Sequence, residues 1–350
     1  MRKILTICGT IVRLGKCGET RMTNTHFWRD RRVLITGCTG MLGSWMSLRL
    51  LQLGADVVGI VRDNIPHSEL VRAGTIKRLN IVRGSITDSD LVLRVFSDYE
   101  IQTCIHLAAQ TAVGIANRAP VPTFETNIRG SWLVLDAARQ WPGLEQMLVA
   151  SSDKAYGAHK DLPYSESVAL QGDHPYDVSK LCTDMIARTY ANTYGLPVAI
   201  TRCANMYGGG DLNWNRIVPG TMRSVINRES PVIRSDGKPK RDYVYVQDIV
   251  RACIMLIENL AEDRDAHSGM AYNFGTDDPV TALEMVESIL DISGVDNVKP
   301  IIQNAASNEI QDQYLSSKLA EERLGWKAEY SLHDGLLETF EWYRTFLLQT

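Results

Sequence analysis

The sequence predicts an α/β protein with a doubly wound parallel sheet and a smaller, mainly C-terminal lobe. Two observations predict this fold class. Between about residue 27 and residue 205, short apolar runs alternate with stretches of helical periodicity, which is typical of βαβ units. Beyond residue 205 the loops become richer in Gly, Pro and Asn and the elements become shorter, as in "MYGGGDLNWNRIVPG".

The elements of the first region follow one another as strand, helix, strand. "RRVLITG" is an apolar run that enters a glycine turn, and the helical stretch after it stops at Gly54. Right-handed crossovers would then place the strands in one parallel sheet. The predicted strands are 31–37, 55–61, 79–86, 103–110, 146–151 and 197–205, and the predicted helices are 40–54, 119–140 and 175–194.

These elements divide the chain into predicted parts. Residues 1–26 are a poorly specified extension, whose run "MRKILTICGTIV" only faintly imitates a signal peptide. Residues 27–205 form the sheet domain, and 240–262 return to it. The smaller lobe then consists of 206–239 and 263–350, and its tail predicts a helix, a turn and a helix that close the domain.

Composition and charge narrow the function classes. The chain has 350 residues, 45% of them apolar and 22% charged, and its net charge is -4. That balance offers no strong field for nucleic acid or an anionic membrane, and no run approaches the ~18 apolar residues of a membrane span. The seven cysteines are scattered and contain no CxxC pair. We therefore expect reduced thiols in a cytoplasmic protein, with no metal site.

The first chemical motif is Gly37-Cys-Thr-Gly40-Met-Leu-Gly43, which follows a strand and opens a helix. This is the context that a dinucleotide site requires. The glycines permit a tight turn and a close approach of the backbone to a pyrophosphate, and the helix N-terminus offers free N–H groups. The motif predicts an NAD(P)-binding Rossmann-type domain. The alternative is a plain tight turn.

The end of the next strand bears on the choice of cofactor. It reads Val61-Arg62-Asp63. An acidic residue here binds the adenosine ribose of NAD, whereas a basic residue accommodates the 2′-phosphate of NADP. Asp63 therefore favours NAD, Arg62 leaves NADP possible, and the alternative is that both side chains are simply solvated.

The second motif is Tyr176-Asp-Val-Ser-Lys180. Residues four apart share one face of a helix, so Lys180 should lie beside Tyr176. An ammonium beside a phenol lowers the pKa of the phenol, which would make Tyr176 a base for a sugar hydroxyl. Lys180 would also hold the nicotinamide ribose. Ser152, about two dozen residues upstream, completes the expected set.

With these residues the chain resembles the extended short-chain dehydrogenase/reductase family of nucleotide-sugar enzymes. The resemblance runs from about residue 27 to the end, and within the family it is greatest to the CDP-glucose 4,6-dehydratase-like members. The segments that carry it are "FWRDRRVLITGCTGMLGSW", "HLAAQTAV", "FETNIRGSW", "SSDKAYG", "HPYDVSK", "TRCANMYGGGD", "RIVPG" and "RDYVYVQDI".

The resemblance implies a 4,6-dehydratase acting on a nucleotide-diphospho-hexose. Tyr176 and Ser152 would act on the carbon 4 hydroxyl, Asp153 would be the acid and Lys154 the base of water elimination. In dTDP-glucose 4,6-dehydratases the triplet is Thr-Asp-Glu, whereas this chain has Ser152-Asp153-Lys154. The alternative is an ion pair at a strand end, since strand neighbours face opposite ways and an adjacent carboxylate favours the charged lysine.

The resemblance also implies cofactor and substrate contacts. Ser85 stands where the family commonly has Asp near the adenine, and the backbone of Ile86 could substitute. His106 and Tyr156 are expected to be packing residues. The expected cofactor contacts are Gly37, Thr39, Gly40, Met41, Leu42, Gly43, Arg62, Asp63, Ser85, Ile86, Leu107, Ala108, Ala109, Gln110, Asn127, Tyr176 and Lys180. The expected substrate contacts are Thr111, Asn205, Arg216, Arg234 and Arg241.

The arginines are expected near the diphosphate because guanidinium groups bind phosphate oxygens in pairs, although a surface salt bridge is the alternative for each of them. A homodimer through 119–140 and 175–194 is typical of the family. Three other activities stay open: a nucleotide-sugar 4-epimerase, a keto-sugar reductase that consumes NADPH, and a dinucleotide-binding sensor without turnover. The sequence does not choose the nucleotide base or the hexose.

Overall fold

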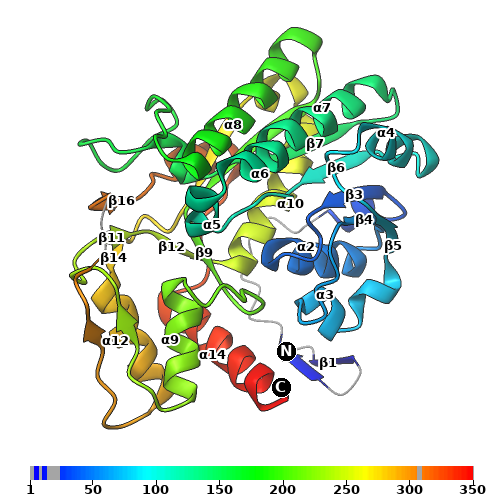
Figure 1. The fold of residues 1–350 in the computed structure, drawn as a ribbon. Helices are drawn as coiled ribbons and strands as arrows, with labels where there is room; N and C mark the ends of the chain where they lie inside the picture. The colour runs from blue at the N-terminus through cyan, green and yellow to red at the C-terminus, as the bar shows by residue number, and fades with distance from the viewer. Residues whose placement is uncertain (1–3, 8–9, 14–23, 306–309, 350) are drawn as a thin grey trace.

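The computed structural model describes residues 4–7, 10–13, 24–305 and 310–349 (Figure 1). Within the predicted extension, β1 (Ile4–Ile7) and β2 (Thr10–Arg13) pair antiparallel. The other residues of 1–23 lie outside the described residues. The helix α1 (Thr25–Trp28) follows, and the indole of Trp28 is buried and donates to Glu258 Oε1 over 2.7 Å. Trp28 is thus part of the hydrophobic core, and Phe27 packs against that core.

A seven-stranded parallel sheet forms the centre of the molecule, in the order β13-β8-β7-β6-β3-β4-β5. The six predicted strands are all present, although β6 ends four residues earlier than expected. The strands are β3 (Arg32–Thr36), β4 (Asp56–Val61), β5 (Asn80–Arg83), β6 (Thr103–His106), β7 (Gln146–Ala150), β8 (Val198–Cys203) and β13 (Ala271–Phe274). The doubly wound fold class is confirmed.

Helices cover both faces of this sheet (Figure 1). Successive residues of a strand point to opposite faces, so each strand contributes to two cores. Leu34 and Val58 pack with α4 (Ser89–Asp98), α7 (Gly130–Gln140) and α8 (Pro175–Tyr194). Val33 and Val57 pack with α2 (Met41–Gln52) and α10 (Val246–Glu262). Of the segment predicted as 240–262, the part in α10 lies against the sheet, whereas residues 240–245 pair with short strands outside it.

The predicted helix 119–140 is divided in the structure. It consists of α6 (Pro120–Phe124), a π-helical turn (Glu125–Arg129) and α7, and a separate helix α5 (Val113–Arg118) precedes it. The carbonyl oxygen of Asn127 in the π-helical turn accepts from the hydroxyls of Ser131 and Thr183. Two side-chain hydroxyls thus satisfy a backbone carbonyl oxygen at the point where the helix is irregular.

The smaller lobe contains α9 (Ile217–Ile226), α12 (Ala282–Ser293) and α14 (Leu332–Gln349), with short strands beside them. The predicted boundary at 263 is wrong for one segment, because β13 pairs with β8 and so completes the large sheet. The short strands are β9 (Asn205–Tyr207), β10 (Val232–Ile233), β11 (Lys240–Arg241), β12 (Tyr243–Tyr245), β14 (Val280–Thr281), β15 (Ile301–Ile302) and β16 (Asp312–Gln313).

The remaining elements are single turns and the first helix of the tail. They are α3 (Glu69–Arg72), η1 (Thr75–Arg78), η3 (Asp153–Tyr156), α11 (Arg264–His267) and α13 (Lys318–Leu324). With α13 and α14 separated by a short turn, the predicted helix-turn-helix tail is confirmed. In the part of the chain that the structure describes, no helix is both long and apolar enough to cross a membrane.

Candidate active site

The carboxyl ends of the parallel strands meet at one edge of the sheet, and the predicted site residues follow these ends. The strand order reverses between β3 and β6, which is where an open α/β sheet forms a ligand crevice. At this point the backbones approach closely, because a Cβ on Gly37 would lie 2.8 Å from the amide nitrogen of Ala108. Gly37 has φ +75°, a conformation that L side chains rarely adopt.

The glycine turn fits a pyrophosphate. Gly40 is the N-cap of α2 and offers no side-chain acceptor to the first amide groups of the helix. A Cβ on Gly43 would lie 2.2 Å from the carbonyl oxygen of Gly37, so the helix can start this close to the turn only with glycine. The predicted residues Gly37, Thr39, Gly40, Met41, Leu42 and Gly43 all belong to this turn and to the start of α2.

Arg62 and Asp63 follow β4 at the position expected for the adenosine ribose. They bind each other, with Arg62 Nη2 at 2.7 Å from Asp63 Oδ2, and both side chains are more than half exposed. Each of the two groups binds the other, so the pair itself does not distinguish a ribose from its phosphate. Both cofactor alternatives thus stay open at this position.

The other predicted cofactor residues surround the same crevice. Ser85 and Ile86 follow β5, and the Ser85 hydroxyl bonds to Thr87 Oγ1. The backbone of Gln110 is fixed by Asn127, whose Oδ1 accepts from the backbone N–H of Gln110 over 2.7 Å. Leu107, Ala108 and Ala109 lie in the irregular segment between β6 and α5.

His106 is confirmed as a packing residue. It is buried, Nδ1 bonds to Thr36 Oγ1 over 2.8 Å, and Nε2 bonds to Ser131. Burial lowers its pKa to about 3, so the imidazole is neutral. Tyr156, buried and bonded to Asn273 Oδ1, is likewise a packing residue.

A cavity of about 810 Å³ lies beside the crevice, between the sheet edge and the smaller lobe. A volume of this size suits a ligand such as a nucleotide sugar. The cavity brings together residues from both parts of the chain. It is lined by all five predicted substrate residues, Thr111, Asn205, Arg216, Arg234 and Arg241, and by four of the predicted catalytic residues, Ser152, Asp153, Lys154 and Tyr176.

Tyr176 and Lys180 lie on α8, and both are buried. Burial raises the pKa of Tyr176 to about 12, although the charge of Arg216 and a hydrogen bond with Ser152 oppose the rise. The predicted lowering of this pKa by Lys180 is therefore wrong for this structure, since desolvation outweighs the nearby charges. Lys180 Nζ donates to the carbonyl oxygen of Ala150 over 2.7 Å, and burial lowers its pKa to about 8.

The Asp153-Lys154 doublet lies in the 3₁₀ turn η3 and not in a strand. Ser152 caps this turn, since its Oγ accepts from the amide of Lys154 over 3.2 Å. Successive residues of a 3₁₀ turn do not alternate between opposite faces, and both residues line the cavity. The Ser152 hydroxyl donates to Asp153 Oδ1 over 2.9 Å, and Lys154 Nζ donates to Gln313 Oε1.

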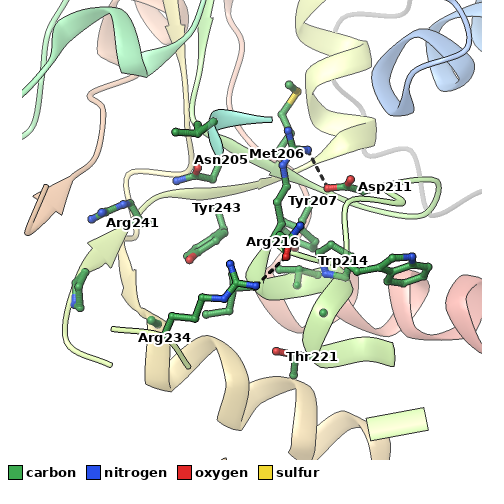
Figure 2. A pocket seen from close by; sticks show the side chains of 18 of the residues that line it. Asn205, Met206, Tyr207, Asp211, Trp214, Arg216, Thr221, Arg234, Arg241 and Tyr243 are labelled. Carbon is green, nitrogen blue, oxygen red and sulfur yellow. Dashed lines mark hydrogen bonds and ion pairs between the residues drawn. The ribbon is translucent and has the colours of Figure 1, made fainter. Parts of the chain in front are cut away.

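Three arginines reach the cavity from different segments of the smaller lobe (Figure 2). Arg216 pairs with Asp211 over 2.9 Å, and Arg234 donates to Asn215 Oδ1 over 2.8 Å. Arg241 is held by backbone carbonyl groups of β11 and of the segment that leads into β16. Each guanidinium is thus oriented by the protein, and the cavity has the positive charge that a diphosphate requires.

Sequence reasoning missed several residues of the cavity. These are Asp211, Trp214, Asn215, Tyr243 and Gln303, which line it, and Gln313, which contacts the doublet. "DLNWNR" gave a signal through its polar and aromatic residues beside Arg216. Gln313 gave none, because its partners lie about 160 residues away in the sequence.

Comparison with known proteins identifies the family of this chain. Residues 34–339 match the family described as GDP-mannose 4,6 dehydratase. The chain belongs to this family. The resemblance to nucleotide-sugar enzymes predicted from the motifs is thereby confirmed.

Two curated relatives cover nearly the whole chain. The chain is 27% identical to the CDP-glucose 4,6-dehydratase of Salmonella typhimurium, over 93% of this chain and 94% of that protein. It is also 27% identical to the dTDP-glucose 4,6-dehydratase of the same organism, over 89% and 92% of the two chains.

Two solved structures are similar in fold. The structure of DesIV, the dTDP-glucose 4,6-dehydratase of Streptomyces venezuelae with NAD and TYD bound, has a TM-score of 0.78 and 28% identity, and covers 90% of this chain and 97% of that one. The UDP-glucose 4-epimerase of Thermotoga maritima, solved with UDP-glucose, has a TM-score of 0.82 and 28% identity, and covers 90% and 99%. Overall fold similarity thus does not separate dehydratases from epimerases.

Proposed function

We propose that this protein is an NAD-dependent nucleotide-diphospho-hexose 4,6-dehydratase, which converts its substrate into a nucleotide-linked 4-keto-6-deoxyhexose and water. One observation carries the proposal. The turn η3 places an acid and an amine, Asp153 and Lys154, among the residues that line the cavity, together with Ser152 and Tyr176. Oxidation at carbon 4 needs only the tyrosine and the serine, whereas water elimination needs an additional acid and base.

Each side chain has a task in this reaction. The nicotinamide ring, when bound, would take a hydride from carbon 4 and return it to carbon 6. Tyr176 takes the proton of the carbon 4 hydroxyl as a phenolate, so the positive charge that NAD brings when bound has to offset the burial that raises the pKa of the phenol. Ser152, whose hydroxyl donates to Asp153 Oδ1 in this structure, turns to donate to the same carbon 4 oxygen. Lys154 takes the proton of carbon 5, which the new ketone acidifies. Asp153 gives a proton to the hydroxyl that leaves carbon 6 as water.

The protons balance over one turnover. Lys154 returns its proton to carbon 5 when hydride reaches carbon 6. The proton that Tyr176 gained replaces the one that Asp153 lost, so the enzyme ends in the state in which it began. Burial of both residues favours this exchange, because a dry site strengthens directed hydrogen bonds and excludes competing water.

An acid and a base that are neighbours in the chain could simply form an ion pair, and the structure gives each of them another hydrogen-bond partner. The Ser152 hydroxyl bonds to Oδ1 of Asp153, which leaves Oδ2 to carry the proton. Lys154 Nζ turns instead toward the neutral amide of Gln313. The two groups thus have different hydrogen-bond partners.

The glycine turn and the open N-terminus of α2 would hold the pyrophosphate of NAD, and Lys180 would hold the nicotinamide ribose. NAD is bound in the similar DesIV structure. Arg62 beside Asp63 keeps NADP as an alternative cofactor. On the substrate side, Arg216, Arg234 and Arg241 would bind the diphosphate.

We further propose that the protein is a cytoplasmic homodimer, without a nucleic-acid or membrane partner. Exposed apolar side chains support the dimer, since they gather on the predicted helices and their neighbours: Val113 and Ile115 on α5, Val121 on α6, Trp132 on α7 and Met185 on α8. The described cysteines are free, and four of the five are buried, as reduced thiols would be.

A panel of nucleotide hexoses tests the function. The purified protein is incubated with CDP-, dTDP-, UDP- and GDP-linked hexoses, and the products are analysed by mass spectrometry. We expect one product to be lighter than its substrate by the mass of one water. A product of unchanged mass would instead support the 4-epimerase, which the similarity to the Thermotoga maritima enzyme favours as the second candidate.

A further inference from the structure

Gln313 connects the end of the chain to the Asp153-Lys154 doublet. It lies in β16, which pairs in parallel with β11, and its side chain is fully buried. Its amide nitrogen donates to the carbonyl oxygen of Asp153 over 3.0 Å. Its amide oxygen accepts from Lys154 Nζ. One side chain therefore holds both members of the doublet, the first by its backbone and the second by its amine.

Resting on the proposed dehydratase function, we propose that Gln313 is a positioning residue for water elimination, which directs the lone pair of neutral Lys154 toward carbon 5 of the hexose. Its role begins after oxidation at carbon 4, because the contacts of Gln313 are with the doublet and not with Tyr176 or Ser152.

The amide geometry carries this assignment. The carbonyl oxygen of Asp153 can only accept, so it fixes the NH₂ end of the Gln313 amide, and Oε1 must then face Lys154. A neutral amine has two N–H groups and one lone pair. When one N–H is given to Oε1, the lone pair is confined to the remaining directions, which include the cavity that Lys154 lines.

The neutrality of Gln313 matters as much as its direction. A carboxylate at this position would bind the same amine but would favour the ammonium form, which has no lone pair. Two acidic residues lie near Lys154: Asp153, its neighbour in η3, and Asp177 on α8, whose pKa is raised by burial but lowered by Lys154. Arg241 lies on β11, opposite Gln313. A carboxylate at residue 313 would add a negative charge directly beside the amine.

The same strand links the doublet to the expected diphosphate site. Arg241 donates to the carbonyl oxygens of Ile310 and Gln311, just before β16. Arg241 and Gln313 are also Cα partners in the β11–β16 pair. A substrate diphosphate that orders Arg241 would thereby steady the strand that holds Lys154.

The test compares Gln313→Glu and Gln313→Leu with the natural chain, each as full-length protein with its cofactor and with the nucleotide hexose that the natural chain dehydrates. Two rates are measured in the same sample: oxidation at carbon 4, from the absorbance of reduced nicotinamide, and water loss, from product mass. Their ratio does not depend on the fraction of protein that is folded. Asp312→Asn is the matched control, since Asp312 lies in the same strand and accepts only from the amide of Lys240 among the contacts described.

We expect Gln313→Leu to keep oxidation and to slow water loss by about 10- to 100-fold, as for a misplaced catalytic group. For Gln313→Glu, the low-pH limb of the water-loss profile should move to higher pH by about 1 unit or more, because a new anion raises the pKa of Lys154. Asp312→Asn should leave the ratio and the profile unchanged.

Two results would overturn the assignment: an unmoved pH profile in Gln313→Glu, or oxidation and water loss that fall together in Gln313→Leu, as for a merely structural residue. Failure of the proposed function would look different. In that case the natural chain itself would release no water from any nucleotide hexose.

Discussion

Replacing Asp184 with Asn should destabilise the whole protein, because Asp184 balances a buried charge. Arg202 on β8 is buried and donates to both carboxylate oxygens of Asp184 on α8, over 2.8 and 2.9 Å. Its third contact is the hydroxyl of Tyr156, in the turn that carries the Asp153-Lys154 doublet. Burial raises the pKa of Tyr156 to about 12, so this partner is neutral.

The size of the effect follows from what the substitution leaves behind. Asparagine keeps one acceptor oxygen but places an NH₂ group against the guanidinium, so Arg202 stays charged and buried and loses the carboxylate bonded to it, while Glu166 remains as a more distant acid. Removing one partner of a buried ion pair costs about 3–5 kcal/mol of unfolding free energy. Because one hydrogen bond survives, we expect about 3 kcal/mol.

Urea unfolding of the cofactor-free protein measures this loss as a lower midpoint with an unchanged slope. Glu341→Gln is the control, since Glu341 pairs with Arg344 at the surface and both side chains are about half exposed. That change should stay within about 0.5 kcal/mol. An Asp184→Asn protein as stable as the Glu341→Gln protein would refute the view that this buried pair supports the sheet and η3.

Two further predictions concern Tyr176 and Asp242. Tyr176→Phe should abolish turnover while cofactor binding, followed by fluorescence titration, is retained, and surviving activity would exclude Tyr176 as the base. Asp242 is buried, one of its carboxylate oxygens has no hydrogen-bond partner among the residues described, and burial raises its pKa to about 6. The unfolded chain releases this proton near pH 4, so Asp242 should make stability fall as pH rises from about 4 to about 6. Asp242→Asn should flatten that part of the urea-midpoint profile, and an unchanged slope would contradict the raised pKa.

The sequence predicted the large sheet well because its signals are local. Apolar runs that end in glycine or serine mark β3 and β7, and the helix α8 has the predicted bounds, with proline at its start and Gly195 at its end. The strand β13 was missed because nothing local distinguishes "AYNF" from the short strands of the lobe. Its partner, β8, lies some 70 residues earlier in the chain.

The site was predicted to a similar extent and for a related reason. Motif residues at the strand ends lie together because parallel strands bring their carboxyl ends to one edge. The protonation of Tyr176 could not be predicted from the spacing of Lys180, because it depends on burial, which the pattern does not give. The contact between Gln313 and Lys154 depends on the pairing of β11 with β16, two strands of two residues each.

The most direct test of the central claim is the reaction run in deuterium oxide with the natural chain and with Lys154→Met. We predict that the natural chain forms a 4-keto-6-deoxyhexose that has lost one water and carries one solvent deuterium at carbon 5. Lys154→Met should still oxidise carbon 4 but lose no water. A natural product of unchanged mass, or water loss that survives in Lys154→Met, would contradict the assignment of the doublet.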